Sequence, residues 1–163
     1  MAGFHYEKNL PHQIAAVRSV LAVFNKAHKI NNPMGENPTI ELSANVFAQN
    51  IQQIQQQNHI ESHLIHQDKV LDISMETGTG KTYTYAQTMF EMHKQLGIYK
   101  FIIAVPTLSI KAGAEQFLKS EALKQHFRLD FEGEYGDTEI ELYVVKSQKS
   151  KKSKNKSKNH PMP

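Results

Sequence analysis

The pattern of apolar and polar positions predicts an amphipathic helix near the start of the chain. Four apolar residues recur three or four positions apart in the stretch LPHQIAAVRSVLAVFNKAH, namely Ile14, Val17, Leu21 and Phe24. This spacing places all four on one face of an α-helix, which predicts a buried stripe. Pro11 suits the first turn of this helix, because a backbone N–H at that position would have no helical partner.

A turn-rich break, NNPMGENP, separates this helix from a second predicted helix. The second helix opens near Ser43 and runs through Asn58, with Phe47, Ile51 and Ile54 on its apolar face. Gln and Asn occupy most of its remaining positions. This polar and biased composition indicates an insertion or an adaptor helix rather than part of the core.

From Val70 onward the pattern changes to strand, turn and helix. The run VLDISM predicts a strand, a glycine-rich turn follows, and helical spacing extends from Thr82 to Leu96. The residues on or near one face of this helix are Ala86, Met89, Phe90, His93 and Leu96. Gly97 is placed to end the helix in a left-handed conformation. The run KFIIAV predicts a second strand, buried on both faces and halted by Pro106.

This order of strand, helix and strand predicts a right-handed βαβ unit with parallel strands. A further helix-like segment follows, LSIKAGAEQFLKSEALKQHF, in which Gly113 is a weak point. The run EIELYVVK (139–146) predicts a third strand.

The composition indicates a single cytoplasmic domain. The chain has 163 residues, 39% of them apolar, which suits one packed domain and not two. The absence of Cys excludes disulfides, thiolate nucleophiles and Cys-based zinc sites. The first residues lack the pattern of a secretion signal, and no apolar run approaches the ~18–20 residues that a membrane span needs. No membrane association is therefore expected.

Positive charge is concentrated in the tail. The formal net charge is +3, but the tail from Lys149 onward carries six Lys and no acidic residue, so the remainder carries −3. The tail has no apolar periodicity and is interpreted as a solvated, disordered terminus. Non-specific contact of its lysines with nucleic-acid phosphates is the alternative, although no aromatic residue offers a stacking surface between them.

A glycine-rich turn before the third predicted helix carries the main functional signal. The segment METGTGKT matches the second half of the Walker A pattern, although Met75 stands where that pattern begins with Gly. Gly78 and Gly80 let backbone N–H groups face phosphate oxygens, and the helix N-terminus adds positive potential. Lys81 is expected to reach the β- and γ-phosphates, and the Thr82 hydroxyl to bind Mg²⁺. A plain glycine turn with a solvated Lys81 is the simpler interpretation, but the strand–turn–helix context favours a nucleotide.

The same turn resembles motif I of superfamily 2 helicases and translocases. With the opening GFHYEKNLPHQIAAV and the continuation YTYAQTMFEM, it resembles the N-terminal part of the restriction (Res) subunit of Type III restriction-modification enzymes, from Phe4 to about Phe117. The resemblance implies an α/β fold, an incomplete P-loop NTPase (RecA-like) lobe with parallel strands. It also implies ATP and Mg²⁺ as cofactors, ATP-driven movement on DNA followed by DNA cleavage, and a modification (methyltransferase) subunit as partner.

The resemblance also assigns roles to individual residues. LPHQIAAV resembles the family's Q-motif, which makes Gln13 the expected reader of adenine, a base whose edge a Gln side chain can pair with. The alternative is an exposed Gln in the first turn of a helix. The expected nucleotide-binding residues are Gln13, Thr77, Gly78, Thr79, Gly80, Lys81 and Thr82.

A second family motif is resembled by AVPTLSIKAG, which is similar to motif Ia. Thr107, Ser109 and Lys111 are therefore candidate donors to the nucleic-acid backbone. The alternative is a strand-to-helix turn in which Thr107 or Ser109 is the N-cap.

An acidic Walker B partner after an apolar strand is missing from the sequence. The nearest acidic stretch, RLDFEGEYGD, is interpreted as a solvated loop containing Asp130, Glu132, Glu134 and Asp137. A D-E-x-H box and a later Arg-bearing motif are also missing, as are the second lobe and nuclease domain that the resemblance implies. Because an arginine finger alone contributes about 10³–10⁵ in rate, turnover by this chain is expected to be negligible.

Two classes of function follow. The first is the N-terminal ATP-binding fragment of a Type III restriction translocase subunit, and the second is a non-catalytic nucleotide-binding or interaction fragment. The Lys- and Asn-rich end suggests a frameshift in an A-rich coding tract, and a truncated chain is equally compatible with the sequence.

Three histidines, His59, His63 and His66, would share one face of a continued second helix. Because zinc would need further ligands, they are interpreted as scattered residues on an exposed helix. The predicted organisation has four parts: an N-terminal helix with the Q-motif-like segment (1–30), a polar Gln/Asn-rich insertion (31–69), a partial RecA-like P-loop lobe (70–146) and a disordered basic tail (147–163).

Overall fold

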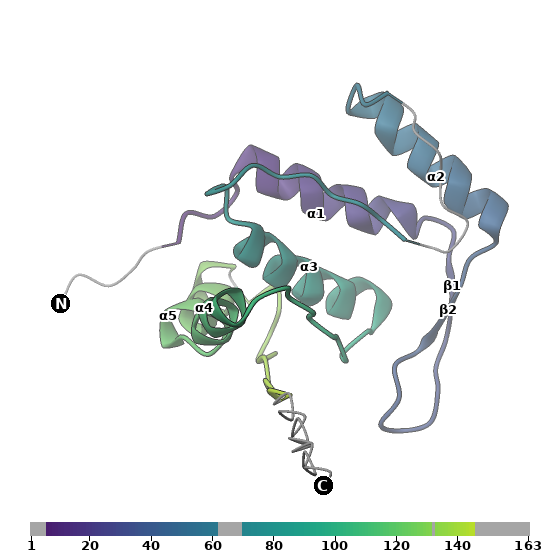
Figure 1. Cartoon of the computed structure of the whole chain (residues 1–163). Helices are drawn as coiled ribbons and strands as arrows, with labels where there is room; N and C mark the ends of the chain where they lie inside the picture. Colours follow the sequence, from purple (N-terminus) through teal and green to yellow (C-terminus); the bar gives the residue numbers. More distant parts are fainter. Residues whose placement is uncertain (1–5, 62–69, 132, 146–163) are drawn as a thin grey trace, which may run out of the picture.

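The computed structural model describes residues 6–61, 70–131 and 133–145, which form several helices and one short hairpin at one side of the molecule (Figure 1). α1 (Pro11–Val23) packs against α3 (Lys81–Leu96) at the centre of the molecule. α2 (Ala44–Gln57) contacts α1, and α4 (Leu108–Leu118) contacts α3. The short α5 (Glu121–Gln125) leads directly into η1 (His126–Asp130), a single π-helical turn.

The first two predicted helices are confirmed. α1 begins at Pro11, and Val17 is buried in its stripe, while Ile14, Leu21 and Phe24 are only half-buried. α2 begins after Ser43, whose hydroxyl accepts a hydrogen bond from the backbone N–H of Val46 at 3.3 Å. Such an N-cap satisfies one of the free N–H groups at a helix start, which is why the sequence locates this boundary well.

A buried amide joins these two helices. Asn50 of α2 donates from Nδ2 to the backbone carbonyls of Val23 and Asn25, at 2.8 and 2.9 Å, and Phe47 beside it is 3% exposed. α2 ends at Gln57, and His59 has a φ of 54°, so the expected helical alignment of three histidines is wrong at its first member. His63 and His66 lie outside the described residues.

The core gathers around α3, as its apolar spacing predicts. Gly97 ends this helix with a φ of 73°, which confirms the left-handed cap. Ala86 and Phe90 are buried, and the Phe90 ring stacks on the Phe127 ring with 4.4 Å between centroids. The buried core consists of Tyr83, Ala86, Phe90, Leu118, Leu123, Phe127, Phe131 and Tyr135.

The helical segment after Pro106 is divided rather than continuous. Gly113 does not interrupt α4, but the chain leaves the helix near Ser120, whose hydroxyl then caps α5 by accepting from the N–H of Leu123 at 3.2 Å. The capping hydroxyl therefore marks the break, because it offers the backbone a local alternative to helix continuation.

The predicted parallel sheet is not formed by the described residues. Their only strands are β1 (His28–Ile30) and β2 (Thr39–Glu41), which pair antiparallel with His28 opposite Glu41. The predicted strands at 70–75, 100–105 and 139–145 carry no ladder, and Ile102 in the second of them is 98% exposed. The expectation was wrong because strand formation depends on a partner strand, whereas an apolar run records only burial tendency. Residues 146–163, including the predicted tail, lie outside the described residues.

Candidate nucleotide-binding site

The glycine-rich turn leads directly into α3 beside the N-terminal end of α1 (Figure 1). Gly78 has a φ of 86° and Gly80, the N-cap of α3, a φ of 85°. Residues with a Cβ rarely adopt this left-handed conformation, so both positions favour glycine. The two glycines of the motif are thus explained by the backbone path of the turn.

One carbonyl closes the turn. The backbone oxygen of Glu76 accepts hydrogen bonds from the Thr79 hydroxyl at 2.7 Å and from the Lys81 ammonium at 2.5 Å. The Thr79 N–H also points to it, at 3.4 Å. The Lys81 side chain is therefore folded over the loop while remaining exposed to solvent.

The start of α1 holds the other side of the loop. Gln13 donates from Nε2 to the carbonyl oxygen of Thr79 at 3.0 Å, and His12 Nε2 lies 3.0 Å from the same oxygen. Gln13 is buried, and a Cβ on Gly80 would collide with its amide nitrogen. Its other terminal atom, Oε1, is buried without a hydrogen-bond partner within the described residues.

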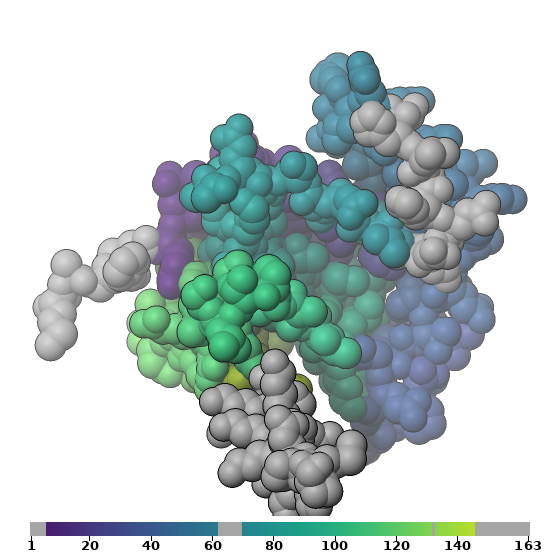
Figure 2. All heavy atoms as spheres, in the orientation of Figure 1, coloured from purple at the N-terminus to yellow at the C-terminus, as the bar shows by residue number. Residues whose placement is uncertain are grey.

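The first turn of α3 presents unpaired N–H groups at this loop. The first helical bond runs from Thr84 N to Gly80 O at 2.9 Å, and the N–H groups before it have no intrahelical acceptor. No acidic residue lies in this turn, so the positive end of the helix dipole is not offset locally. Gly78 and Lys81 are exposed, and Figure 2 shows the teal segment before α3 at the molecular surface.

The structure therefore brings Gln13 together with the loop residues predicted from the sequence, Thr77 to Thr82. Gln13 is not an exposed residue of a first helical turn, as one interpretation held, because it is 5% exposed and bonded to the loop. Its contact with adenine stays a prediction, as do the phosphate and Mg²⁺ contacts of the loop.

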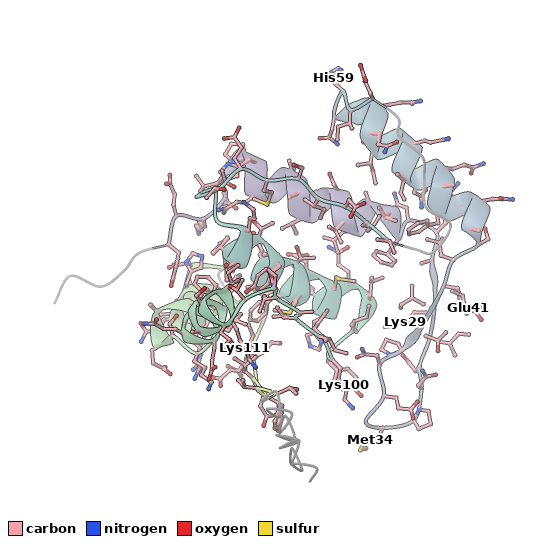
Figure 3. The ribbon with its side chains drawn as sticks, in the orientation of Figure 1. Lys29, Met34, Glu41, His59, Lys100 and Lys111 are labelled. Atoms are coloured by element: carbon pink, nitrogen blue, oxygen red, sulfur yellow. The ribbon has the colours of Figure 1, made fainter. Side chains whose placement is uncertain are left out.

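The motif Ia candidates lie at the start of α4. Thr107 is the N-cap, and its hydroxyl accepts from the N–H of Ile110 at 3.3 Å and lies 3.1 Å from the Ser109 hydroxyl. Lys111, labelled in Figure 3, donates to the backbone oxygen of Val145. The N-cap interpretation of Thr107 is thus confirmed, and backbone contacts with nucleic acid stay a prediction.

Sequence reasoning missed a buried polar network two residues after Lys81. The Tyr83 hydroxyl lies 2.8 Å from His126 Nε2, and His126 Nδ1 lies 2.5 Å from Asp130 Oδ2. Burial, reinforced by the Asp130 carboxylate, raises the pKa of Tyr83 to about 12. No local pattern signals a pair 43 residues apart, so this network required the structure.

The acidic stretch after α5 is more structured than a solvated loop. Asp130 bonds to His126, and Phe131 and Tyr135 within the stretch belong to the core. Glu134 pairs with Lys94 at 3.0 Å, and Asp137 lies 3.4 Å from Arg128. Glu132 lies outside the described residues. These three described carboxylates contact partners other than Lys81 and Thr82. None of them therefore provides the acidic Walker B group beside the loop.

Two kinds of feature are missing from the described residues: a cluster of metal ligands and a membrane-spanning helix. These residues contain no group of three His, Asp or Glu side chains arranged to hold a metal ion. Among their helices, none combines the length and the apolar character needed to cross a bilayer.

Comparison with known sequences identifies a protein family that includes this chain and the segments that form the site. The family profile for the Res subunit of Type III restriction enzymes matches residues 8–163. The chain is 48% identical over 163 residues to the Res subunit of the Type III restriction-modification enzyme EcoPI of Escherichia phage P1, and 47% identical to that of EcoP15I of Escherichia coli. Each alignment covers 95% of this chain and 16% of the relative. The StyLTI Res subunit of Salmonella typhimurium is 42% identical over 92 residues, which cover 54% of this chain and 9% of that relative. The chain thus spans about 16% of the length of the first two relatives.

Proposed function

The chain belongs to the family of Type III restriction enzyme Res subunits, and from this membership we propose that it is the segment of such a subunit that binds ATP with Mg²⁺. In this proposal the loop of residues 77–82 surrounds the phosphates, and Gln13 contacts the adenine base. The observation that supports the proposal is the hydrogen bond from Gln13 Nε2 to the Thr79 carbonyl, because it joins the side chain proposed to contact the base to the turn proposed to bind the phosphates.

The residues present fit such a ligand. The exposed loop offers free N–H groups and the Lys81 ammonium, which suit phosphate oxygens. Gln13 Oε1, a buried acceptor with no hydrogen-bond partner among the described residues, has the chemistry to accept from the adenine amino group. The Thr82 hydroxyl would bind the Mg²⁺ ion, which neutralises phosphate charge when bound.

A role in the complete enzyme extends this proposal. The family relationship favours ATP hydrolysis coupled to movement on DNA and to DNA cleavage, with a modification (methyltransferase) subunit as partner. Thr107, Ser109 and Lys111 are then the candidate contacts to the DNA backbone. A cytoplasmic location is part of the same proposal.

Binding without turnover is the second candidate. It is favoured because the described carboxylates of the one acidic stretch considered for a Walker B role bond to side chains outside the loop. These carboxylates are Asp130, Glu134 and Asp137. Without an acidic residue to hold Mg²⁺ and position water, a P-loop binds nucleotide but hydrolyses it slowly.

Phosphate release from ATP separates the two candidates. The purified chain is incubated with Mg²⁺-ATP, with and without double-stranded DNA, while nucleotide binding is measured on the same preparation. Binding without DNA-stimulated release supports the non-catalytic segment. DNA-stimulated release that Lys81→Ala abolishes supports a motor activity in this chain, and absence of binding rejects both.

A further inference from the structure

Two donors from the first turn of α1 converge on a single acceptor in the loop. Gln13 Nε2 and His12 Nε2 each lie 3.0 Å from the carbonyl oxygen of Thr79. A backbone carbonyl has two lone pairs, so these two side chains together use its full accepting capacity. Two side chains of α1 therefore hold the backbone of the loop in position.

Holding this carbonyl also fixes the next amide. The peptide bonds of the described residues include no cis bond, so the Gly80 N–H points opposite to the Thr79 C=O. Because the carbonyl faces α1, the Gly80 N–H faces away from α1, at the position directly before the free N–H groups of α3. The N–H groups at the start of a helix are those that bind an anion, and the Gly80 N–H is next to them in sequence.

We propose that His12 is a positioning residue of the phosphate loop, which acts with Gln13 on the Thr79 carbonyl to aim the Gly80 amide at a bound phosphate. The inference rests on the proposed nucleotide-binding function, and it adds a residue that the sequence motifs do not assign. His12 acts through Thr79 and Gly80, without contact to the ligand.

The geometry gives His12 a task that Gln13 does not complete alone. Gln13 Nε2 donates to the loop, and Oε1 is proposed to accept from the base. A bound nucleotide would therefore place two demands on the position of one side chain. Among the described residues, His12 has Thr79 as its one hydrogen-bond partner. It therefore keeps the carbonyl in place while Gln13 adjusts. This requires a proton on Nε2, as in the corresponding neutral tautomer or the imidazolium.

The position of His12 in the chain supports this task. Pro11 precedes it and fixes φ at the first residue of α1, and the N–H of Gln13 is already bonded to Leu10 O at 3.0 Å. The backbone conformation at His12 is therefore determined within α1 and does not depend on the loop. Since the His12 side chain is exposed, its substitution removes a hydrogen bond without opening the core.

Matched variants test the inference in the full chain. His12→Phe keeps a ring but removes the donor, whereas His12→Gln places an amide N–H at the reach of Nε2, and His12→Asn falls short of it. The affinity for a fluorescent ADP analogue with Mg²⁺ is expected to fall about three- to tenfold in the Phe and Asn variants, as loss of one net hydrogen bond implies. His12→Gln is expected to stay within about twofold of the wild type. His28→Phe, the same change at an exposed position of β1, should have no effect.

Specificity distinguishes positioning from base contact. Because His12 acts on the phosphate loop, His12→Phe should weaken ATP and GTP analogues by the same factor. Equal affinity of His12→Phe and wild type would overturn the role of His12 and leave the nucleotide site standing. Failure of His12→Gln to restore binding would also overturn it. Absence of binding by the wild-type chain would instead reject the proposed function itself.

Discussion

Gln13 donates its side-chain N–H to the backbone oxygen of Thr79, and the two atoms lie 3.0 Å apart although 66 residues separate them in the chain. This contact joins the first turn of α1 to the glycine-rich loop before α3. It leaves Oε1 of the same side chain buried without a partner within the described residues. The two ends of this amide therefore differ: Nε2 is hydrogen-bonded to the loop, whereas the buried Oε1 retains its accepting capacity for the proposed adenine contact.

Substitution of Gln13 should change base selectivity. If Oε1 accepts from the adenine amino group, Gln13→Ala removes the only proposed contact that distinguishes adenine from guanine. The preference for ATP over GTP is then expected to fall about tenfold, since a site built to pair with a polar group discriminates through that pair. Competition of both nucleotides against a fluorescent ADP analogue measures the ratio. An unchanged ratio would show that Gln13 serves the loop alone.

The two loop glycines should respond differently to alanine. Both have a φ near +86°, so each substitution is expected to cost about 1–2 kcal/mol of folding free energy from left-handed strain. A Cβ at Gly78 meets no atom within 4 Å, whereas a Cβ at Gly80 collides with the Gln13 amide. Gly80→Ala should therefore weaken nucleotide binding more than Gly78→Ala. Urea unfolding and nucleotide titration of both variants test this, and equal losses of affinity would contradict it.

Asn50 should matter for stability and not for the ligand. Asn50→Ala leaves the carbonyls of Val23 and Asn25 without their side-chain donor, which is expected to cost about 1–3 kcal/mol. These carbonyls lie at the C-terminal end of α1, about 15 Å along the helix from Gln13 at the usual 1.5 Å rise. Asn58→Ala, which removes an exposed bond to Ile54 O, is the matched control. A large loss of nucleotide affinity in Asn50→Ala, with the fold intact at the assay temperature, would show that α2 takes part in the site.

Alkaline pH should destabilise the fold through buried tyrosines. Burial and the Asp130 carboxylate raise the pKa of Tyr83 to about 12, and burial with Glu91 raises the pKa of Tyr135. A tyrosine in the unfolded chain loses its proton near pH 10. The stabilising contribution is therefore complete below pH 10 and is lost as the pH rises from 10 toward 12. Urea unfolding across this range should show the fall, with a shallower slope in Tyr83→Phe. An identical slope in that variant would contradict the assignment.

The helices were predictable because their signals are local. Pro11, Ser43 and Gly97 each mark a helix boundary through their own backbone or side chain, and the structure confirms all three boundaries. The β1–β2 hairpin was not predicted, since its strands are three residues long and flank a stretch recognised only as a turn-rich break. In the structure, Asn37 joins that break to the segment that follows α3 by accepting from the N–H groups of Tyr99 and Lys100. Figure 3 shows Lys100 beside the loop that carries Met34.

The strand predictions were wrong and the helix predictions correct because strand pairing, unlike a helix boundary, is not a local property of the sequence. The run from Phe101 to Val105 has the composition of a buried strand, yet Ile102 and Ile103 are exposed. The candidate site was likewise predictable only in its local part. Its glycines and Lys81 were identified from residue type alone, and Gln13 from family resemblance. His12 and the Tyr83–His126 pair escaped notice, because their contacts span 67 and 43 residues without a pattern in the sequence.

Nucleotide binding by Lys81→Ala tests the central claim most directly. The wild-type chain is expected to bind an ATP analogue with Mg²⁺, and the variant to bind it about tenfold or more weakly, because a charge-assisted contact to phosphate is lost. Its urea unfolding transition should match that of the wild type, since Lys81 is exposed and, within the part of the chain that the structure describes, bonds only to Glu76 O. Lys119→Ala at the C-cap of α4, which removes an ion pair with Glu115, controls for loss of charge. Equal binding by Lys81→Ala and the wild-type chain would contradict the account.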